Sequence, residues 1–258
     1  MPNSKAQIPN KVKMSKLKYQ IPPLAPFNKG GKGDFGVWIS AYCLLPTACY
    51  HMYILAFLGS YLVGSIPFAY LVARWAGGID ITRYGSGNVG ATNVARAMGL
   101  RYGSVVFLMD MLKGFMPVYL ASIYGGGTVH PPLSVGAADL AILCGLGAIL
   151  GHVFPVYLRF QGGKAAATSF GVFIWLAPKA LLIAFAAWGV TVLITRYVSL
   201  GSIMGAVSFC VIMVTLYNEP FGQGLYLTLF SFIIAVLVIL RHKENIRRLL
   251  AGTERKIG

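Results

Sequence analysis

Long apolar runs, separated by short polar segments, dominate the chain from Met52 onward. A transmembrane helix needs about 20 mostly apolar residues. Seven segments meet or approach this requirement: 53–75, 104–124, 138–158, 165–178, 180–196, 200–217 and 223–240. The fourth and fifth segments run together and are divided at the turn signal around Pro178, and the fourth is short enough to be kinked or re-entrant. The pattern predicts an all-α, polytopic membrane protein with about seven transmembrane helices.

Composition supports this prediction. Hydrophobic residues make up 57% of the chain and charged residues only 11%, whereas soluble domains carry about 25% charged residues. The mean hydropathy is +0.69. The formal net charge of +15 fits cytoplasmic loops and anionic lipid headgroups better than nucleic acid, because the chain is so apolar. We therefore expect a membrane partner and no nucleic acid.

The basic residues alternate between loops. The loop after the first predicted span contains Arg83, Arg96 and Arg101, whereas residues 125–137 contain no Lys or Arg. Because Lys and Arg collect on cytoplasmic loops, the C-terminus is predicted inside. All the polar, glycine-rich segments then fall on this one cytoplasmic side. A transporter more often places its site near the bilayer midplane, whereas an interfacial site suits an enzyme that builds lipids.

Residues 1–51 do not fit this topology, because they carry seven Lys and one Asp on the side predicted to be external. We expect them to be a disordered extension or an over-called translation start, with Met52 as the effective start. The predicted seven-helix domain is 52–258.

The first polar segment contains Gly85, Gly87 and Gly90 in the spacing G-x-G-x-x-G. It follows a membrane span and not a strand, so a dinucleotide site is not indicated. Glycines still let backbone N–H groups approach an anion, and a helix starting near Ala91 would direct its positive end toward it. Further polar groups follow in Ser86, Asn88, Thr92, Asn93 and Arg96. The alternative is a flexible interfacial turn.

Two further segments could hold an anion. Gly162-Gly163-Lys164 places two glycines and a cation just before an apolar helix, and His152 lies at the end of the preceding span. The tail from Arg241 to Glu254 is rich in basic residues. By itself it is typical of a basic helix held by anionic lipid, and a lone His at a span end is more often a hydrogen-bonded interfacial residue.

Two charged residues fall inside a predicted span. Asp110 and Lys113 are three residues apart and so share a helix face. Charges at that depth are costly unless paired or hydrated, so they form either a structural ion pair or part of a site. The four cysteines have no metal or redox spacing, and we expect neither a metal nor another cofactor.

These residues together resemble the bacterial acyl-phosphate:glycerol-3-phosphate acyltransferase family (PlsY). The resemblance extends over essentially 52–258 and includes three family motifs in order. Its segments are Gly64-Ser65-Ile66-Pro67, Gly85 to Asn93, Asp110 to Gly114, Gly151 to Pro155, Phe160 to Lys164, His242 to Asn245 and Gly252 to Glu254. Residues 1–51 have no counterpart in the family pattern, and Ala165 stands where the family usually has Gly.

The resemblance implies a seven-helix enzyme that moves a fatty acyl group from acyl-phosphate to the 1-hydroxyl of glycerol 3-phosphate. The products would be lysophosphatidic acid and phosphate, in the first committed step of phospholipid synthesis. Neither acyl-CoA nor acyl-carrier protein would serve as donor, and a soluble enzyme would supply the acyl-phosphate. The implied location is the bacterial inner membrane, with the site facing the cytoplasm. The oligomeric state stays open, with a monomer as the simplest case.

The resemblance also implies residue roles. Ser86 and Arg96 would be needed for activity, and Glu254 would mainly support the structure. With the reasoning above, the predicted catalytic residues are Ser86, Arg96, His152 and Lys164, and Asp110 joins Glu254 in structural support. The predicted substrate-binding residues are Gly87, Asn88, Thr92, Asn93, Lys113, Gly162, Gly163, Ser202, His242 and Asn245.

The chemistry agrees with this assignment. Two phosphate-bearing substrates repel each other unless fixed cations neutralise their charge. Arg96 and Lys164 are the predicted cations, and Lys113 is a further candidate. Phosphate is a good leaving group and no Ser-His-Asp set is evident, so direct transfer between bound substrates is predicted. The departing phosphate or His152 would take the hydroxyl proton. The alternative functions are a small-anion or phosphate-ester transporter and a non-catalytic scaffold.

Overall fold

The structure is a computed structural model that describes residues 46–124, 137–217, 220–222 and 224–257. All of them belong to one of two compact units, Phe35–Gly258. The expected extension, residues 1–51, lies almost wholly outside the described residues. The first described helix, α2, begins at Pro46, so the predicted boundary at Met52 falls inside a helix and stays a prediction.

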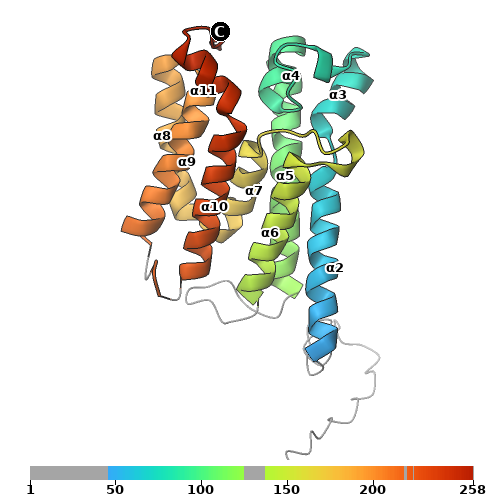
Figure 1. Cartoon of the computed structure of the whole chain (residues 1–258), viewed down its shortest axis with the longest axis vertical. Coiled ribbons are helices and arrows are strands. Elements are labelled where there is room, and N and C mark those ends of the chain that lie inside the picture. The colour runs from blue at the N-terminus through green and yellow to red at the C-terminus, as the bar shows by residue number, and fades with distance from the viewer. Residues whose placement is uncertain (1–45, 125–136, 218–219, 223, 258) are drawn as a thin grey trace, which may run out of the picture. The chain divides into compact units, whose positions relative to one another are not determined.

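The described part of the chain is helical throughout (Figure 1). Its α-helices are α2 (Pro46–Ser65), α3 (Phe68–Gly77), α4 (Ala91–Met98), α5 (Leu100–Tyr124), α6 (Ala137–Val153), α7 (Ala166–Leu176), α8 (Pro178–Thr195), α9 (Val198–Thr215), α10 (Leu225–Arg241) and α11 (Lys243–Leu250). Two short 3-10 turns, η1 (Ile81–Arg83) and η2 (Val156–Leu158), lie in the loops. The predicted all-helical membrane fold is confirmed.

Among the described residues, five segments are long and apolar enough to cross a membrane, or up to six if α10 and α11 count as one bent span. Helix α7 is a shorter apolar helix of 11 residues, and it corresponds to the predicted fourth segment. The prediction of about seven membrane helices is therefore consistent with the structure. The fourth is short because Pro178 starts α8 almost immediately after it.

The first span is broken near the end where the polar loops gather. Helix α2 ends at Ser65 and α3 begins at Phe68, with Pro67 between them. Proline has no N–H to donate and interrupts the helical ladder. The carbonyl oxygen of Ile66 then accepts a hydrogen bond from the Lys113 ammonium at 2.8 Å. The break is thus held by a side chain from α5.

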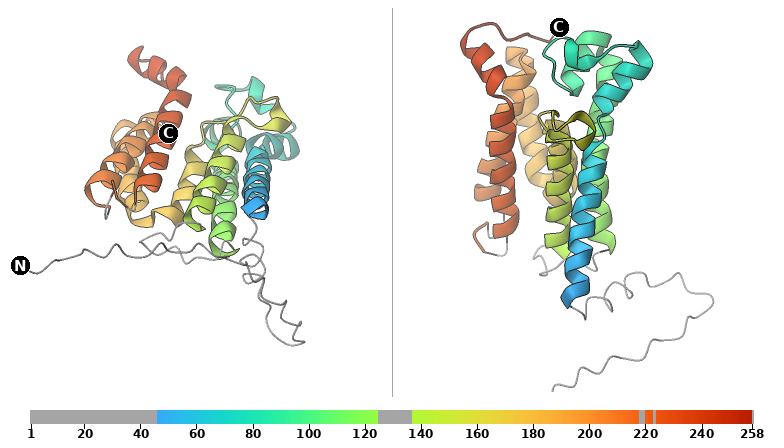
Figure 2. Two further views of the ribbon diagram at one scale, coloured as in Figure 1. Left: turned by 60° about the horizontal axis from the view of Figure 1, so that its bottom comes forward. Right: turned by 45° about the vertical axis from the view of Figure 1, so that its right-hand side comes forward.

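Glycines bring the helices close together. Helix α2 lies along α6 (Figure 2), and a methyl group added to Gly64 would overlap the carbonyl of Ala148. Helix α5 lies against α7 in the same way, because methyl groups on Gly114 and Gly171 would overlap the carbonyls of Thr168 and Met111. Small residues at such contacts are typical of membrane helices, which associate through close packing.

Outward-facing side chains are large and apolar. Leu193 and Ile194 of α8 are 82% and 78% exposed, which suits contact with lipid. Helix α10 bends by 55° into α11 at His242. Helices α3, α4 and α11 lie at the same end of the helices, opposite the end of α5 and the start of α6 (Figure 1). The polar segments from distant parts of the sequence therefore gather at one end.

Candidate active site

The glycine-rich loop before α4 is organised by Asn93. The side-chain oxygen of Asn93 accepts from the Ser86 N–H at 3.1 Å, and its amide nitrogen lies 3.2, 2.9 and 3.1 Å from the carbonyl oxygens of Ile81, Tyr84 and Asn88. Asn93 is 2% exposed. Because the loop itself uses these groups, the structure gives Asn93 the task of shaping the loop, and its predicted contact with substrate stays a prediction.

Other polar side chains of this loop and of the start of α4 are not fully buried. Ser86 is exposed, and Asn88 and Thr92 are half-buried. Gly87 has a φ of 67° and a Cβ there would approach the Thr82 carbonyl oxygen to 3.0 Å, so this turn favours glycine. Helix α4 begins at Ala91, as predicted, and no side chain caps it. The Asn93 N–H donates to the Gly90 carbonyl at 3.1 Å, which leaves the Ala91 and Thr92 N–H groups for an anion.

The second loop uses its glycines differently from the prediction. The N–H groups of Gly162 and Gly163 donate to the carbonyls of Val153 and His152, at 3.2 and 3.1 Å. These N–H groups are therefore used by the fold, and the predicted contact of the two glycines with substrate stays a prediction. Methyl groups there would overlap His152 and Pro155. These glycines are needed because the chain turns back against the end of α6.

Arg241 holds the same turn from its other side. Its Nε donates to the Gly163 carbonyl at 3.2 Å and its Nη2 donates to the Gly162 carbonyl at 3.0 Å. Ala165, which follows Lys164, has a φ of 61° and is the uncapped residue before α7. The backbone here is left-handed although the residue is not glycine, which costs roughly 1–2 kcal/mol.

Lys164, at the end of this turn, reaches the C-terminal segment. Its ammonium donates to the side-chain oxygen of Asn245 on α11. The Asn245 amide in turn donates to Glu254 at 2.8 Å. The predicted site residues Lys164, Asn245 and Glu254 are therefore in one hydrogen-bonded chain, although Lys164 is 81 positions from Asn245 in the sequence.

Glu254 is the centre of this cluster. Its side chain is 1% exposed, and it accepts hydrogen bonds from Arg248 at 2.7 Å and from Ser199 at 3.1 Å, besides Asn245. The Arg96 guanidinium lies 3.9 Å away and donates to the Arg255 carbonyl at 2.9 Å. One carboxylate thus joins α4, α9 and α11.

The cluster shifts the ionisation of its members. Burial lowers the pKa of Lys164 to about 8, and the nearby charge of Arg248 adds to this effect, while Glu254 opposes it. Burial also lowers the pKa of Arg96. For Glu254, burial acts to raise the pKa, but hydrogen bonds from Arg248, Asn245 and Ser199 outweigh it and hold the pKa below its ordinary value. Positive charge therefore dominates around Lys164.

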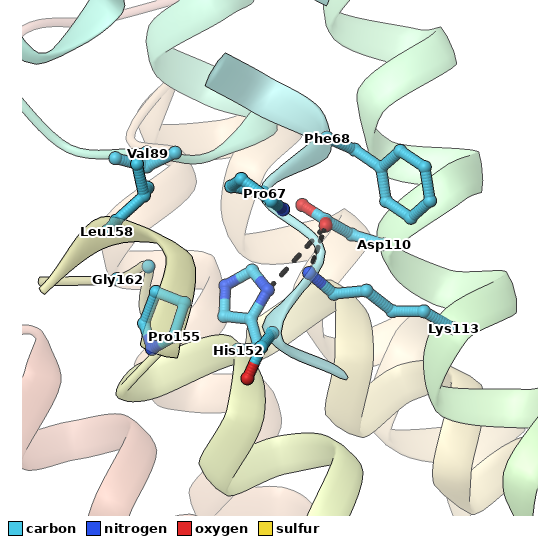
Figure 3. Close-up of a pocket in the computed structure, with 11 residues that line it drawn as sticks. Pro67, Phe68, Val89, Asp110, Lys113, His152, Pro155, Leu158 and Gly162 are labelled. Carbon is cyan, nitrogen blue, oxygen red and sulfur yellow. Dashed lines mark ion pairs between the residues drawn. The ribbon is translucent and has the colours of Figure 1, made fainter. Parts of the chain in front are cut away.

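A second group of ionisable residues lies beneath the turn. Lys113 Nζ is 2.9 Å from Asp110 Oδ1, so the two residues on this helix face are paired, and His152 Nδ1 is 3.6 Å from the same oxygen. These residues line a small cavity of about 10 Å³, room for about one water, together with Gly162 and Gly163 (Figure 3). The contact between Asp110 and His152 was not predicted.

Two predicted site residues, His242 and Ser202, each lie within hydrogen-bond distance of a backbone carbonyl one turn earlier. His242 lies at the bend between α10 and α11, is 4% exposed, and its Nδ1 is 2.7 Å from the Val238 carbonyl. Ser202 donates to the Val198 carbonyl within α9, at 3.0 Å. Ser199, one turn earlier, is the serine that reaches Glu254. Sequence reasoning also missed Arg241 and Arg248, whose only signal was a basic tail.

The fold and the site define a class. This is an all-helical integral membrane protein with a cationic site built from distant loops at one end of its helices. The sequence model for the family Glycerol-3-phosphate acyltransferase matches residues 54–252, and the chain belongs to that family. The family predicted from the motifs is confirmed.

Individual relatives agree with this assignment. "Glycerol-3-phosphate acyltransferase 2" of Moorella thermoacetica is 45% identical over 207 residues, which cover 80% of this chain and 98% of the relative. "Glycerol-3-phosphate acyltransferase" of Desulforamulus reducens is 43% identical over 206 residues, or 80% of this chain and 95% of the relative.

Solved structures agree as well. A crystal structure of PlsY (YgiH), an integral membrane glycerol 3-phosphate acyltransferase in its glycerol 3-phosphate form, is 38% identical with a TM-score of 0.69, covering 80% of this chain and 96% of that one. The lysophosphatidic acid form has a TM-score of 0.68 at 38% identity, with the same coverage.

Proposed function

We propose that this protein transfers a fatty acyl group from acyl-phosphate to the 1-hydroxyl of glycerol 3-phosphate, giving lysophosphatidic acid and inorganic phosphate. The family match and the relatives support the acyltransferase assignment. The named forms of PlsY, with glycerol 3-phosphate and with lysophosphatidic acid, support the acceptor and the product. The acyl-phosphate donor is the further step in the proposal.

The observation that carries the proposal is the convergence of cations from distant segments. Lys164 and Arg96 both neighbour the group formed by Asn245 and Glu254. Two phosphate-bearing substrates bring several negative charges into one site, and hydrogen bonds to charged groups contribute about 1.5–3 kcal/mol each. A planar guanidinium and a compact ammonium are suited to different phosphates. The site therefore fits two anionic substrates held side by side.

The proposed chemistry is direct transfer. The 1-hydroxyl oxygen attacks the acyl carbonyl carbon, a new C–O ester bond forms, and the bond from that carbon to the phosphate oxygen breaks. Phosphate leaves with the bonding electron pair, and the hydroxyl proton passes to that phosphate or to His152. Lys164, Arg96 and Ser86 would hold the reactants and stabilise the carbonyl oxygen as it gains charge. Holding both reactants supplies the main rate gain.

The remaining substrate-binding roles stay within this proposal. Gly87 and Asn88 lie on the loop before α4, Thr92 lies in the first turn of α4, and His242 and Asn245 lie at the start of α11. They would align the glycerol phosphate. Ser202 would contribute from α9, and the glycines 162 and 163 would contribute by letting Lys164 approach. The proposed catalytic domain is 52–258.

The proposed setting is the inner membrane of a bacterial cell, with the site facing the cytoplasm, where a soluble enzyme supplies acyl-phosphate. The many basic residues at the end with α4 and α11 support this orientation. The competing transporter function finds no support in the comparisons, whose named relatives are acyltransferases.

The test is an assay of purified protein in detergent with acyl-phosphate and glycerol 3-phosphate, measuring phosphate and lysophosphatidic acid. Equal release of both is expected, and acyl-CoA in place of acyl-phosphate is expected to give no product. Arg96→Lys and Lys164→Ala are expected to lose at least about 100-fold in kcat/KM, while exposed Arg101→Lys serves as the matched control. No product from the wild type would refute the proposal, and an acyl group trapped on Ser86 would refute direct transfer.

A further inference from the structure

The group beneath the turn consists of three buried ionisable side chains from two membrane helices. Lys113 and Asp110 of α5 are each 3% exposed, and His152 of α6 is 6% exposed. Lys113 Nζ and His152 Nδ1 lie 2.9 and 3.6 Å from the same oxygen, Asp110 Oδ1. Charged groups inside a membrane protein are costly unless they are paired. Lys113 at one edge of this network and His152 at the other also lie against the backbone of other segments. These contacts identify the segments that the network joins.

One edge is the break in the first membrane span. The Lys113 ammonium donates to the Ile66 carbonyl at 2.8 Å and lies 5.6 Å from the centre of the Phe68 ring. The same Ile66 carbonyl accepts from the Phe68 N–H at 3.1 Å. Lys113 therefore adds a second hydrogen bond at the break. Its ammonium is therefore held by the Ile66 carbonyl and by Asp110, and its predicted contact with substrate stays a prediction.

The other edge is the turn that precedes Lys164. The Gly163 N–H donates to the His152 carbonyl at 3.1 Å, and a methyl group on Gly163 would overlap Nε2 of the same His152. The Val89 carbonyl oxygen of the glycine-rich loop would lie 2.8 Å from that methyl group. The imidazole thus supports the backbone where the two loops meet, with its other nitrogen turned toward Asp110 (Figure 3).

We infer that Asp110, Lys113 and His152 are positioning residues, which fix the turn that carries Lys164 against the break between α2 and α3. The inference rests on the proposed function, because Lys164 is the residue through which they act on the reaction. Arg241 holds the same turn from above through the Gly162 and Gly163 carbonyls. His152 supports the turn whether the hydroxyl proton passes to the departing phosphate or to its imidazole.

This role makes a distinct prediction about Lys164. The ammonium lies among Arg96, Arg241, Arg248 and Glu254, and its pKa is lowered to about 8 mainly by burial. If the support is removed, the turn relaxes toward water and the pKa rises toward the ordinary lysine value. A misplacement of about 1 Å can also reduce the rate by about 100-fold.

The experiment measures the pH midpoint of Lys164 acetylation, resolved by mass spectrometry in folded, detergent-solubilised protein with exposed Lys243 as the internal reference. In His152→Leu, which keeps much of the side-chain volume, the midpoint is expected to rise by at least about one unit, and kcat/KM is expected to fall at least about tenfold. His152→Gln, which keeps a polar group beneath Gly163, is expected to recover part of both. Ser122→Ala removes a buried hydroxyl elsewhere on α5 and is expected to move neither.

A midpoint that stays near 8 in His152→Leu overturns the inference, whether the rate falls or not. If His152→Leu does not fold, the paired change Asp110→Asn with Lys113→Gln removes both charges together, and an unchanged midpoint there overturns the inference equally. A wild type without acyl transfer would refute the proposed function but would leave the acetylation result valid.

Discussion

The Lys164 ammonium donates a hydrogen bond to the side-chain oxygen of Asn245, which is 81 positions further along the chain. This bond joins the turn before α7 to the first turn of α11. Asn245 passes the connection on to Glu254. The last membrane helix and its bent extension are thereby tied to the loop that carries the main cation of the site, so the C-terminal segment is part of the site and not a detached basic tail.

Glu254→Gln tests this connection. Its carboxylate is 1% exposed and is bound by Arg248 at 2.7 Å, so removing the charge leaves that guanidinium without its partner. We expect a loss of roughly 2 kcal/mol in the free energy of unfolding, measured by thermal unfolding in detergent. Exposed Glu244→Gln on α11 is the control, and equal melting temperatures for the two variants would contradict the role of Glu254.

The pKa of Glu254 also predicts how the free energy of unfolding changes at acid pH. The folded-state pKa of Glu254 is held below its ordinary value of 4.5. Its contribution is therefore fully present above about pH 4.5 and is lost as the pH falls through the folded-state value. Glu254→Gln is expected to lack this component of acid destabilisation.

The pKa of Lys164 predicts how activity declines at alkaline pH. Its pKa of about 8 means that the ammonium loses its proton as the pH rises through that value. We expect kcat/KM, which reports the free enzyme, to fall about tenfold per pH unit well above pH 8. Lys164→Arg is expected to have a lower maximum but no decline between pH 8 and 10, because guanidinium stays charged.

Unfolding does not explain such a decline. Between about pH 8 and the ordinary lysine value of 10.5, the unfolded chain binds more protons at this residue than the folded chain. This group therefore makes the folded state relatively more stable as the pH rises through that window. A decline in kcat/KM that persisted unchanged in Lys164→Arg would assign the titration to another group.

The sequence was sufficient for the approximate positions of the apolar helices and for the gathering of the polar loops at one end. Apolar run length located the spans, and the alternation of basic loops placed Ser86, Lys164 and Asn245 on one side. The start of α4 at Ala91 and the pair of Asp110 with Lys113 followed from local helix geometry. These features depend on short-range patterns, which a single sequence contains.

The remaining features depend on where distant backbone segments cross. Arg241 could not be distinguished from other basic residues until its guanidinium was found on the Gly162 and Gly163 carbonyls. The sequence did not show that the N–H groups of those glycines donate to the carbonyls at the end of α6, where the chain folds back. Asn93 likewise belongs to the loop interior because the loop closes around it.

Close helix packing gives a prediction that is independent of catalysis. A methyl group on Gly171 of α7 would overlap the Met111 carbonyl of α5, whereas Gly59 of α2 has nothing within 4 Å. Gly171→Ala is expected to lower the free energy of unfolding by about 1–3 kcal/mol. Gly59→Ala is expected to be neutral or stabilising by up to about 1 kcal/mol. The same melting temperature shift in both variants would show that the contact between α5 and α7 tolerates a side chain.

A substitution of Arg241 can distinguish a residue that supports the turn from one that contacts substrate. Two of its N–H donors hold two consecutive carbonyls, those of Gly163 at 3.2 Å and Gly162 at 3.0 Å, and lysine cannot reproduce this fork. Arg241→Lys keeps the charge, so a purely electrostatic role predicts little change in rate. Support of the turn predicts a fall in kcat/KM of about 10- to 100-fold, together with an upward shift in the acetylation midpoint of Lys164. Arg247→Lys, an exposed change on α11, is the control. A fall in rate with an unshifted Lys164 midpoint would mean that Arg241 binds a substrate phosphate directly.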